Sequence, residues 1–573
     1  MILKSLYDYA QSQSGALPPR GMERKEIEFI IVIDSEGRFK RFEHKRIDKK
    51  QCISFLVAKG VKRTSAPKSN ILWDNGKYVL GKNDKQGKCN ALFVEIVKEI
   101  ANRHPEDVSI QAVLKFYSDP EPDREEKMKA DSLYTKVDEG MSANFSFRYE
   151  PDDMLIAEKK YRFEHRLDES SDTSESGRCL ITGVRGPLVR TTTPTPLPDN
   201  SPMAALVAFQ VNSGYDSYGK TQAYNSPISA DAEETFSAVL KRFLGKDSRN
   251  KVRLGNRMLL FWGSGDEKVN EEVEEGLMCM LEIPDKKIVD LDEKIDKVEK
   301  LCKSIFSGEI KTMLDDRFHI LGLAPNTGRI AVVLWMDSEL KDFAEKILSH
   351  FEDMEITDNR NPDKRRPYVG VYSMVSAVTQ GGKISDALPN LVDETVKSVI
   401  FGTQYPFPLY TGALQRIKAE LSDISPTIQR VAILKAYINR KHRNQNQHKQ
   451  LQVMLDKNNT NPGYLCGRLT AVLEKIQSDA NTGDSIRTRY MGAASTTPAA
   501  VMPAMLNLSL HHSEKLSEGS RIHFEQLKQE IVDKLPADSC FPAHLDLNDQ
   551  GRFFVGYYHQ RTDLYTKKEN KQQ

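Results

Sequence analysis

The chain contains 573 residues, with 82 Lys and Arg against 81 Asp and Glu, which gives a net charge of +1. This length is too great for one hydrophobic core and predicts roughly three or four domains, and the balanced charge excludes a protein coated uniformly in basic residues. Because no apolar run approaches the roughly 18 residues of a membrane span and the N-terminus lacks a signal-peptide core, we expect a cytoplasmic protein without a membrane contact.

The first 120 residues predict mixed α and β structure. Residues 26–34 are rich in β-branched side chains and predict a strand, and a turn signal at 35–37 leads to its hairpin partner at 38–42. Residues 90–101 carry apolar side chains at helical spacing and predict a helix.

The strongest charge feature lies in residues 38–68, where eleven Lys and Arg are opposed by only two acids, a balance of +9. This segment runs into apolar residues 70–81, which are broken by a predicted turn at 74–76. Lys and Arg neutralise phosphates, and amide side chains on a rigid turn can reach base edges, so the pattern fits nucleic acid. A solvated basic face beside an ordinary hairpin explains the pattern equally well.

A second candidate site follows a Pro- and Thr-rich linker at 191–202 and a buried strand expected at 203–210. The loop at 212–229 is rich in Gly, Asn, Ser and Tyr, so Tyr218 could stack on a base and Lys220 could hold a phosphate. A structural loop packed between domains explains this composition slightly better.

The remainder of the chain predicts an α+β middle region and a helical end. Between residues 266 and 299 thirteen acids stand against five Lys, with helical spacing. The middle strands are expected at 257–262, 318–324 and 329–335, and an amphipathic helix at 338–350. From residue 387 onward helical patterns with short connections predict a bundle.

The fold class is therefore α+β, with mixed α/β N-terminal and middle regions followed by an all-α C-terminal bundle. The expected domains are residues 1–190, 203–386 and 387–573.

A third basic group lies between Asp423 and Asp456, where the sequence holds six Lys and Arg and no acid. Five of them are candidates for a surface that follows a nucleic-acid backbone: Arg430, Lys435, Arg440, Lys441 and Arg443. Several of these recur at a spacing of five, so they would spiral around a helix, and a solvated helix end favoured by the helix dipole is the alternative interpretation.

No motif indicates catalysis, a cofactor or a bound metal. Residues 76–83 fit Gly-x4-Gly-Lys, but the hydroxyl needed after the lysine is missing and 78–80 look strand-like, which argues against nucleotide binding. The seven cysteines form no CxxC pair, so neither a zinc knuckle nor a disulfide framework is indicated. We therefore expect a protein that is not an enzyme.

Several stretches together resemble the large subunit of the type I-C CRISPR Cascade complex, over nearly the whole chain. The most specific are residues 1–9, 73–81, 216–219 with 225–229, 320–326, 434–440, 467–477 and 556–561. The resemblance implies a non-enzymatic, DNA-binding role in a ribonucleoprotein complex for antiviral defence. Its members recognise the protospacer-adjacent motif in double-stranded DNA, help to separate the strands into an R-loop, and help to recruit a helicase-nuclease.

The resemblance also implies partners. These are the CRISPR RNA-loaded backbone subunits, the RNA-processing subunit, a small subunit, the target duplex and the recruited helicase-nuclease. In some members an internal translation start yields the C-terminal part as a separate small subunit, and Met454 would open such a product here, spanning 454–573.

We expect residues 62–77 to form the motif-reading element. Phosphates would be held by Lys62, Arg63, Lys68 and Lys77, and base edges would be contacted by Asn70 and Asn75. Two other classes remain open, a stand-alone DNA nuclease and an assembly scaffold that never touches DNA.

Overall fold

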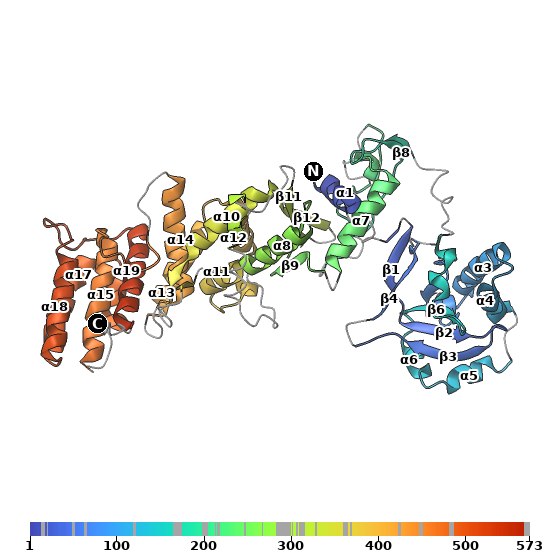
Figure 1. The fold of residues 1–573 in the computed structure, drawn as a ribbon, viewed down its shortest axis with the longest axis horizontal. Coiled ribbons are helices and arrows are strands. Elements are labelled where there is room, and N and C mark those ends of the chain that lie inside the picture. Colours follow the sequence, from blue (N-terminus) through green and yellow to red (C-terminus); the bar gives the residue numbers. More distant parts are fainter. Residues whose placement is uncertain are drawn as a thin grey trace. The chain divides into compact units, whose positions relative to one another are not determined.

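The computed structural model describes residues 1–12, 18–19, 21–48, 52–61, 63, 66–118, 122–163, 175–197, 204–211, 214, 218–245, 248–265, 267–281, 300, 302–304, 307–308, 316–326, 329–358, 365–366, 369–421, 426–445, 451–480 and 486–566. The chain divides into two compact units (Figure 1). The first contains Leu3–Thr195 and Val207–Arg242, and the second contains Pro196–Leu206 and Phe243–Gln573.

The first unit is built on a four-stranded sheet in the order β3-β2-β6-β5. Its strands are β2 (Phe29–Ile33), β3 (Phe39–His44), β5 (Trp73–Asn75) and β6 (Asn144–Tyr149). Strand β2 pairs antiparallel with β3 and parallel with β6, and all five of its side chains are buried. A continuous apolar run is what a central strand covered on both faces requires.

Helices pack against this sheet through aromatic side chains. The ring of Phe116 in helix α4 lies 5.1 Å from that of Phe147 in β6, and both belong to one hydrophobic cluster. The helices of the unit are α1 (Ile2–Ser12), α2 (Gly76–Val79), α3 (Lys88–Arg103), α4 (Val108–Ser118), α5 (Arg124–Ala130), α6 (Tyr134–Glu139) and α7 (Ala230–Leu244), with short 3-10 turns at Ile156–Glu158, Lys160–Phe163 and Gln222–Asn225.

Two small ladders complete the first unit. Strand β1 (Met22–Glu26) pairs antiparallel with β4 (Ser54–Ala58), and β7 (Ser176–Arg178) pairs with β8 (Arg185–Pro187). Helix α7 begins at Ala230, and the Ser229 hydroxyl caps it by accepting the Ala232 N–H at 3.4 Å.

The second unit contains an antiparallel sheet in the order β12-β11-β10-β9. Its strands are β9 (Lys251–Leu254), β10 (Arg257–Gly263), β11 (Arg317–Asn326) and β12 (Arg329–Glu339), and a two-residue pair, β13 (Ile356–Thr357) with β14 (Arg365–Arg366), lies outside it. Helix α8 (Glu267–Leu281) follows β10, and α10 (Leu340–Met354) follows β12. The acidic segment beyond residue 281, up to 299, lies outside the described residues.

Helices make up the rest of the second unit. They are α11 (Val371–Val378), α12 (Pro389–Phe401), α13 (Phe407–Ala419), α14 (Ile428–Asn444), α15 (Pro462–Asp479), α16 (Ile486–Ala494), α17 (Pro498–Ser513), α18 (Glu518–Val532) and α19 (Leu547–Tyr565), with a 3-10 turn at Ile384–Asp386. One hydrophobic cluster runs from Val252 in the sheet to Tyr558 in α19, so sheet and helices share a core. The predicted α+β class is confirmed.

Helices α15 and α19 lie side by side at the C-terminal end of the chain (Figure 1). Glycines allow this close approach: a Cβ at Gly467 would overlap the carbonyl oxygen of Phe553, and a Cβ at Gly556 would overlap that of Tyr464. Two of the stretches that carry the family resemblance, 467–477 and 556–561, thus meet in one helix pair.

Two local predictions are wrong. Residues 78–80 do not form a strand, because Asn75 ends β5 and its Oδ1 accepts the Lys77 N–H at 3.1 Å, which starts helix α2. The strand-like character of 78–80 is therefore no longer an argument against a nucleotide-binding loop. The missing hydroxyl after the lysine still argues against one. The described residues 204–210 do not form a strand, and only Ala205 takes part in an isolated β-bridge.

Candidate nucleic-acid interface

A buried carboxylate organises the predicted motif-reading element. Asp74, only 1% exposed, accepts the N–H groups of Asn70 at 3.0 Å and Asn75 at 2.8 Å, and it forms an ion pair with Arg63. Burial raises the pKa of the Asp74 carboxyl, and the Asn70 N–H and the Arg63 charge offset only part of that effect. These bonds bring Arg63, Asn70 and Asn75 together around one side chain.

The turn after Asp74 is also fixed from a second side. The Gly76 N–H donates to the Met141 carbonyl at 2.9 Å, and a Cβ at Gly76 would come within 2.5 Å of the Met141 sulfur. Trp73 donates its indole N–H to the Ala58 carbonyl at 2.9 Å. Rigid backbone on both sides is what a side chain needs to be presented in one orientation.

Asn75 is half-buried and Lys77 is exposed on this platform. The Asn75 Oδ1 is used by the Lys77 N–H, but within the described residues nothing accepts a hydrogen bond from the Asn75 Nδ2. The side chain of Lys77 is exposed and forms no ion pair there. An amide donor beside a free ammonium group can contact a base edge and a phosphate.

The other members of the predicted reader have different places. Asn70 is buried and its Oδ1 accepts the Val61 N–H at 2.9 Å, so the fold already uses its amide oxygen, and a base contact by this side chain stays a prediction. Arg63 lies 4.2 Å from the centroid of the Tyr78 ring and is committed to Asp74, which leaves it a positioning role. Lys68 is exposed, and its carbonyl accepts the Arg63 Nε–H at 2.7 Å. Lys62 lies outside the described residues.

The charge of the basic segment is partly neutralised in space. Arg46 bonds to Glu28 at 2.8 Å, Lys40 to Asp34 at 3.0 Å, and Arg41 to Glu150 at 2.8 Å. All three carboxylates lie outside residues 38–68. The local balance of +9 therefore overstates the positive field of this face.

The second candidate site is exposed in part. Tyr218 is fully exposed at a positive φ of 53°, and Lys220 is exposed beside it. Tyr224 is buried, and the Asn225 Nδ2 ties the loop together by donating to the Lys220 carbonyl at 3.2 Å. Stacking by Tyr218 and phosphate binding by Lys220 stay predictions.

The third candidate group is mostly buried inside the second unit, where the fold uses three of its cations internally, and a nucleic-acid contact by them stays a prediction. Arg430 pairs with Glu420 and donates to the Ala377 carbonyl at 2.9 Å. Lys435 donates to the Asp353 carbonyl at 3.0 Å, and burial lowers its pKa to about 8.

Arg440 is the most enclosed of the group. It bonds to the Asp353 carboxylate at 2.7 Å and covers the Tyr405 ring at 3.8 Å. Arg443 pairs with the same carboxylate from a half-buried position. A spacing of five spreads cations around a helix, and α14 is buried on all sides, so these cations find internal acceptors. Lys441, half-buried near the helix end, stays a prediction.

A family model for CRISPR-associated protein (Cas_Csd1) matches residues 3–565. The chain belongs to the Cas_Csd1 family. The resemblance to the type I-C Cascade large subunit is thereby confirmed, and the chain is a CRISPR-associated Cascade subunit. No curated protein matches it.

Sequence reasoning missed the central residue of this Cas_Csd1 site. The sequence at 74–76 predicts only a turn. An acid that follows so many cations in the sequence nevertheless indicates a structural ion pair, which Asp74 forms with Arg63. No group of His, Cys, Asp and Glu suited to a metal occurs in the described part of this family member. None of its described helices is long and apolar enough to cross a bilayer.

Proposed function

We propose that this Cas_Csd1 subunit is a non-catalytic, cytoplasmic DNA-binding component of the type I-C complex. It recognises the protospacer-adjacent motif in target double-stranded DNA, helps to open the duplex into an R-loop and helps to recruit the helicase-nuclease. Its partners are the CRISPR RNA-loaded backbone, the RNA-processing subunit and the small subunit. The Asp74-anchored turn, which presents the Asn75 amide beside Lys77, is the observation that carries the proposal.

Reading a short motif needs a donor held at a fixed place against the major or minor groove. Asn75 meets this need, since its backbone is held by Asp74 and its Oδ1 by the Lys77 N–H, so only the Nδ2 is left to contact DNA. Lys77 and Lys68 lie on exposed backbone nearby and supply sequence-independent phosphate contacts.

The test is target-duplex binding by the assembled, guide-loaded complex, with and without the flanking motif and across a salt series. Asn75→Ser keeps an oxygen that can cap helix α2, so the turn should keep its structure. Because the amide donor is lost, we expect the difference in binding free energy between duplexes with and without the motif to fall by about 1–3 kcal/mol. Lys77→Ala is expected to weaken all duplexes and to reduce the salt slope by about 0.9. Lys98→Ala, an exposed lysine on α3, is the matched control.

If Asn75→Ser still discriminates the motif, the reader lies elsewhere and the Tyr218 loop becomes the next candidate. If Lys77 and Asn75 variants both bind every duplex as the wild type does, the subunit is an assembly scaffold at this surface.

A separate product from Met454 remains part of the proposal. Met454 is half exposed in a loop that precedes α15, so a start there would cut no helix. The segment after it is nevertheless tied to the rest of the unit: Tyr410 donates to the Leu547 carbonyl at 2.6 Å, and Tyr558 to the Thr357 carbonyl at 3.0 Å. Absence of a fragment of that length from the untagged gene would contradict this part.

A further inference from the structure

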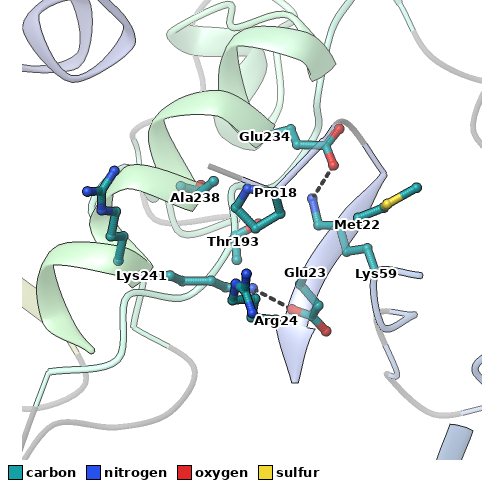
Figure 2. Close-up of a pocket in the computed structure, with 11 residues that line it drawn as sticks. Pro18, Met22, Glu23, Arg24, Lys59, Thr193, Glu234, Ala238 and Lys241 are labelled. Carbon is teal, nitrogen blue, oxygen red and sulfur yellow. Dashed lines mark hydrogen bonds and ion pairs between the residues drawn. The ribbon is translucent and has the colours of Figure 1, made fainter. Parts of the chain in front are cut away.

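A cavity of about 400 Å3 lies within the first unit, beside strand β1 and helix α7 (Figure 2). Its volume falls within the roughly 300–1,000 Å3 of small-molecule sites. The lining consists of Pro18, Met22, Glu23, Arg24, Lys59, Thr193, Glu234, Ser237, Ala238, Lys241 and Arg242. Four of these side chains are cationic and two are acidic, so the cavity carries an excess of two positive charges.

Both acids are occupied by the fold. Glu23 accepts the Gly60 N–H at 3.0 Å and pairs with Lys241 at 3.2 Å. Glu234 accepts the Gly21 N–H at 3.0 Å and pairs with Lys59 at 3.3 Å.

The Glu23 carboxyl stays charged in this setting. Burial alone would raise its pKa, but the charge of Lys241 and the Gly60 N–H outweigh that effect and hold the pKa below its usual value. Neither acid is therefore left to neutralise the remaining cations.

Arg24 is the cation without a partner. It makes no hydrogen bond or ion pair within the part of the chain that the structure describes, and Figure 2 shows its side chain reaching the same corner of the cavity as Lys241. Thr193 and Arg242 also line the cavity, which adds a hydroxyl-bearing residue and a further cation to its lining.

Three lining residues are apolar: Pro18, Met22 and Ala238. Figure 2 shows Pro18 between Glu234 and Arg24. The site thus combines several cations and a hydroxyl-bearing residue with apolar side chains able to cover a flat or ring-shaped group.

We propose that this cavity binds one nucleotide unit, with its phosphate on Arg24 and Lys241 and its sugar or base against Pro18 and Met22. Arginine forks bind phosphate oxygens in pairs, and a phosphate monoester, with a charge of about −1.5 to −2 at pH 7, matches the excess of two cations. The nucleotide is either free or the phosphorylated end of a strand. This site is distinct from the turn at Asn75, so it stands whether or not that turn reads DNA.

The test is calorimetric titration of the purified full-length chain with three probes: AMP, inorganic phosphate, and a short single-stranded oligothymidylate with or without a 5′-phosphate. If AMP binds, a free nucleotide is enough to occupy the cavity. Binding of only the 5′-phosphorylated oligonucleotide identifies a strand end. Binding of neither AMP nor the phosphorylated strand overturns the proposal, as does equal binding of inorganic phosphate alone with no gain from the nucleoside.

Three variants locate the site. Arg24→Gln is expected to weaken the bound probe by about 10-fold or more, because a hydrogen-bonded charge is lost. Arg185→Gln, an exposed and unpaired arginine in strand β8, removes the same charge elsewhere and is expected to change nothing. An equal loss in both variants would mean non-specific attraction and would overturn the proposal.

Glu23→Gln is expected to change the affinity for the probe in the opposite direction. Its Oε1 can still accept the Gly60 N–H, but Lys241 loses a competing carboxylate, so phosphate binding is expected to tighten about 2- to 5-fold. A structural role alone predicts weaker binding in this variant. Thermal melting of each variant checks that the first unit is folded.

Discussion

Replacing Arg440 with methionine should destabilise the second unit without removing a DNA contact. The guanidinium bonds to the Asp353 carboxylate at 2.7 Å and to the carbonyls of Ser398 and Thr403 at 2.9 and 3.0 Å. Its side chain is 1% exposed and that of Asp353 is 0% exposed. Removing one partner of a buried pair costs about 3–5 kcal/mol. Because Arg443 still pairs with Asp353, we expect a loss near the lower value.

The assay is urea unfolding of the full-length chain followed by tryptophan fluorescence. Two of the three tryptophans, Trp262 and Trp335, lie in the second unit, so the signal mainly reports on it. The double variant Asp353→Asn/Arg440→Met tests the cause, since it removes both members of the most buried pair and should recover part of the loss, although Arg443 then loses its partner. Arg443→Met, at a half-exposed position, should cost less than Arg440→Met.

One result would refute this reasoning. If Arg440→Met kept the unfolding midpoint of the wild type but weakened all duplexes and flattened the salt dependence of the complex, Arg440 would be a phosphate contact. The buried network drawn around Asp353 would then not describe the assembled protein.

Two further predictions concern the same unit. Burial, with Arg440 nearby, lowers the pKa of His350 to about 3, and burial with Lys435 does the same for His559. Both are neutral in the fold but protonate in the unfolded chain below about 6.5, so stability is lost as the pH falls, by about 2 kcal/mol per histidine between pH 7 and 5; urea midpoints that are equal at both pH values would contradict this. Gly467→Ala should destabilise the α15–α19 pair by about 1–3 kcal/mol despite alanine's better helix propensity, and an unchanged melting temperature would show that the helices are less tightly packed.

Most helices and long strands could be predicted because their signals are local. The periodic apolar residues of 90–101 and the β-branched run at 26–34 carry their own evidence, and both predictions are confirmed. The start of helix α2 could not be separated from a hairpin turn, since an Asn-Gly pair suits both and only the Lys77 N–H to Asn75 bond decides.

The candidate site was harder to predict because charges cancel across the sheet rather than along the chain. Arg46 meets Glu28, which directly precedes strand β2, and Arg41 meets Glu150 more than a hundred residues later. A count of charges within one segment cannot include those partners. The same limit applies to Arg440, whose acceptors on Asp353 and Ser398 are brought to it only by the packing of α10 on α14 and of α12 on α10.

The cations of this chain therefore fall into two groups, according to whether the fold pairs them with an acid. Where a carboxylate is buried beside a cation, as with Asp74 and Arg63, the pair positions backbone and is a poor candidate for a phosphate contact. Where no acid among the described residues forms an ion pair with the cation, as at Arg24 and Lys77, the positive charge is left for a ligand. Nucleic-acid affinity in this subunit should accordingly depend on a few unpaired cations, and its salt dependence should be much weaker than a local charge of +9 suggests.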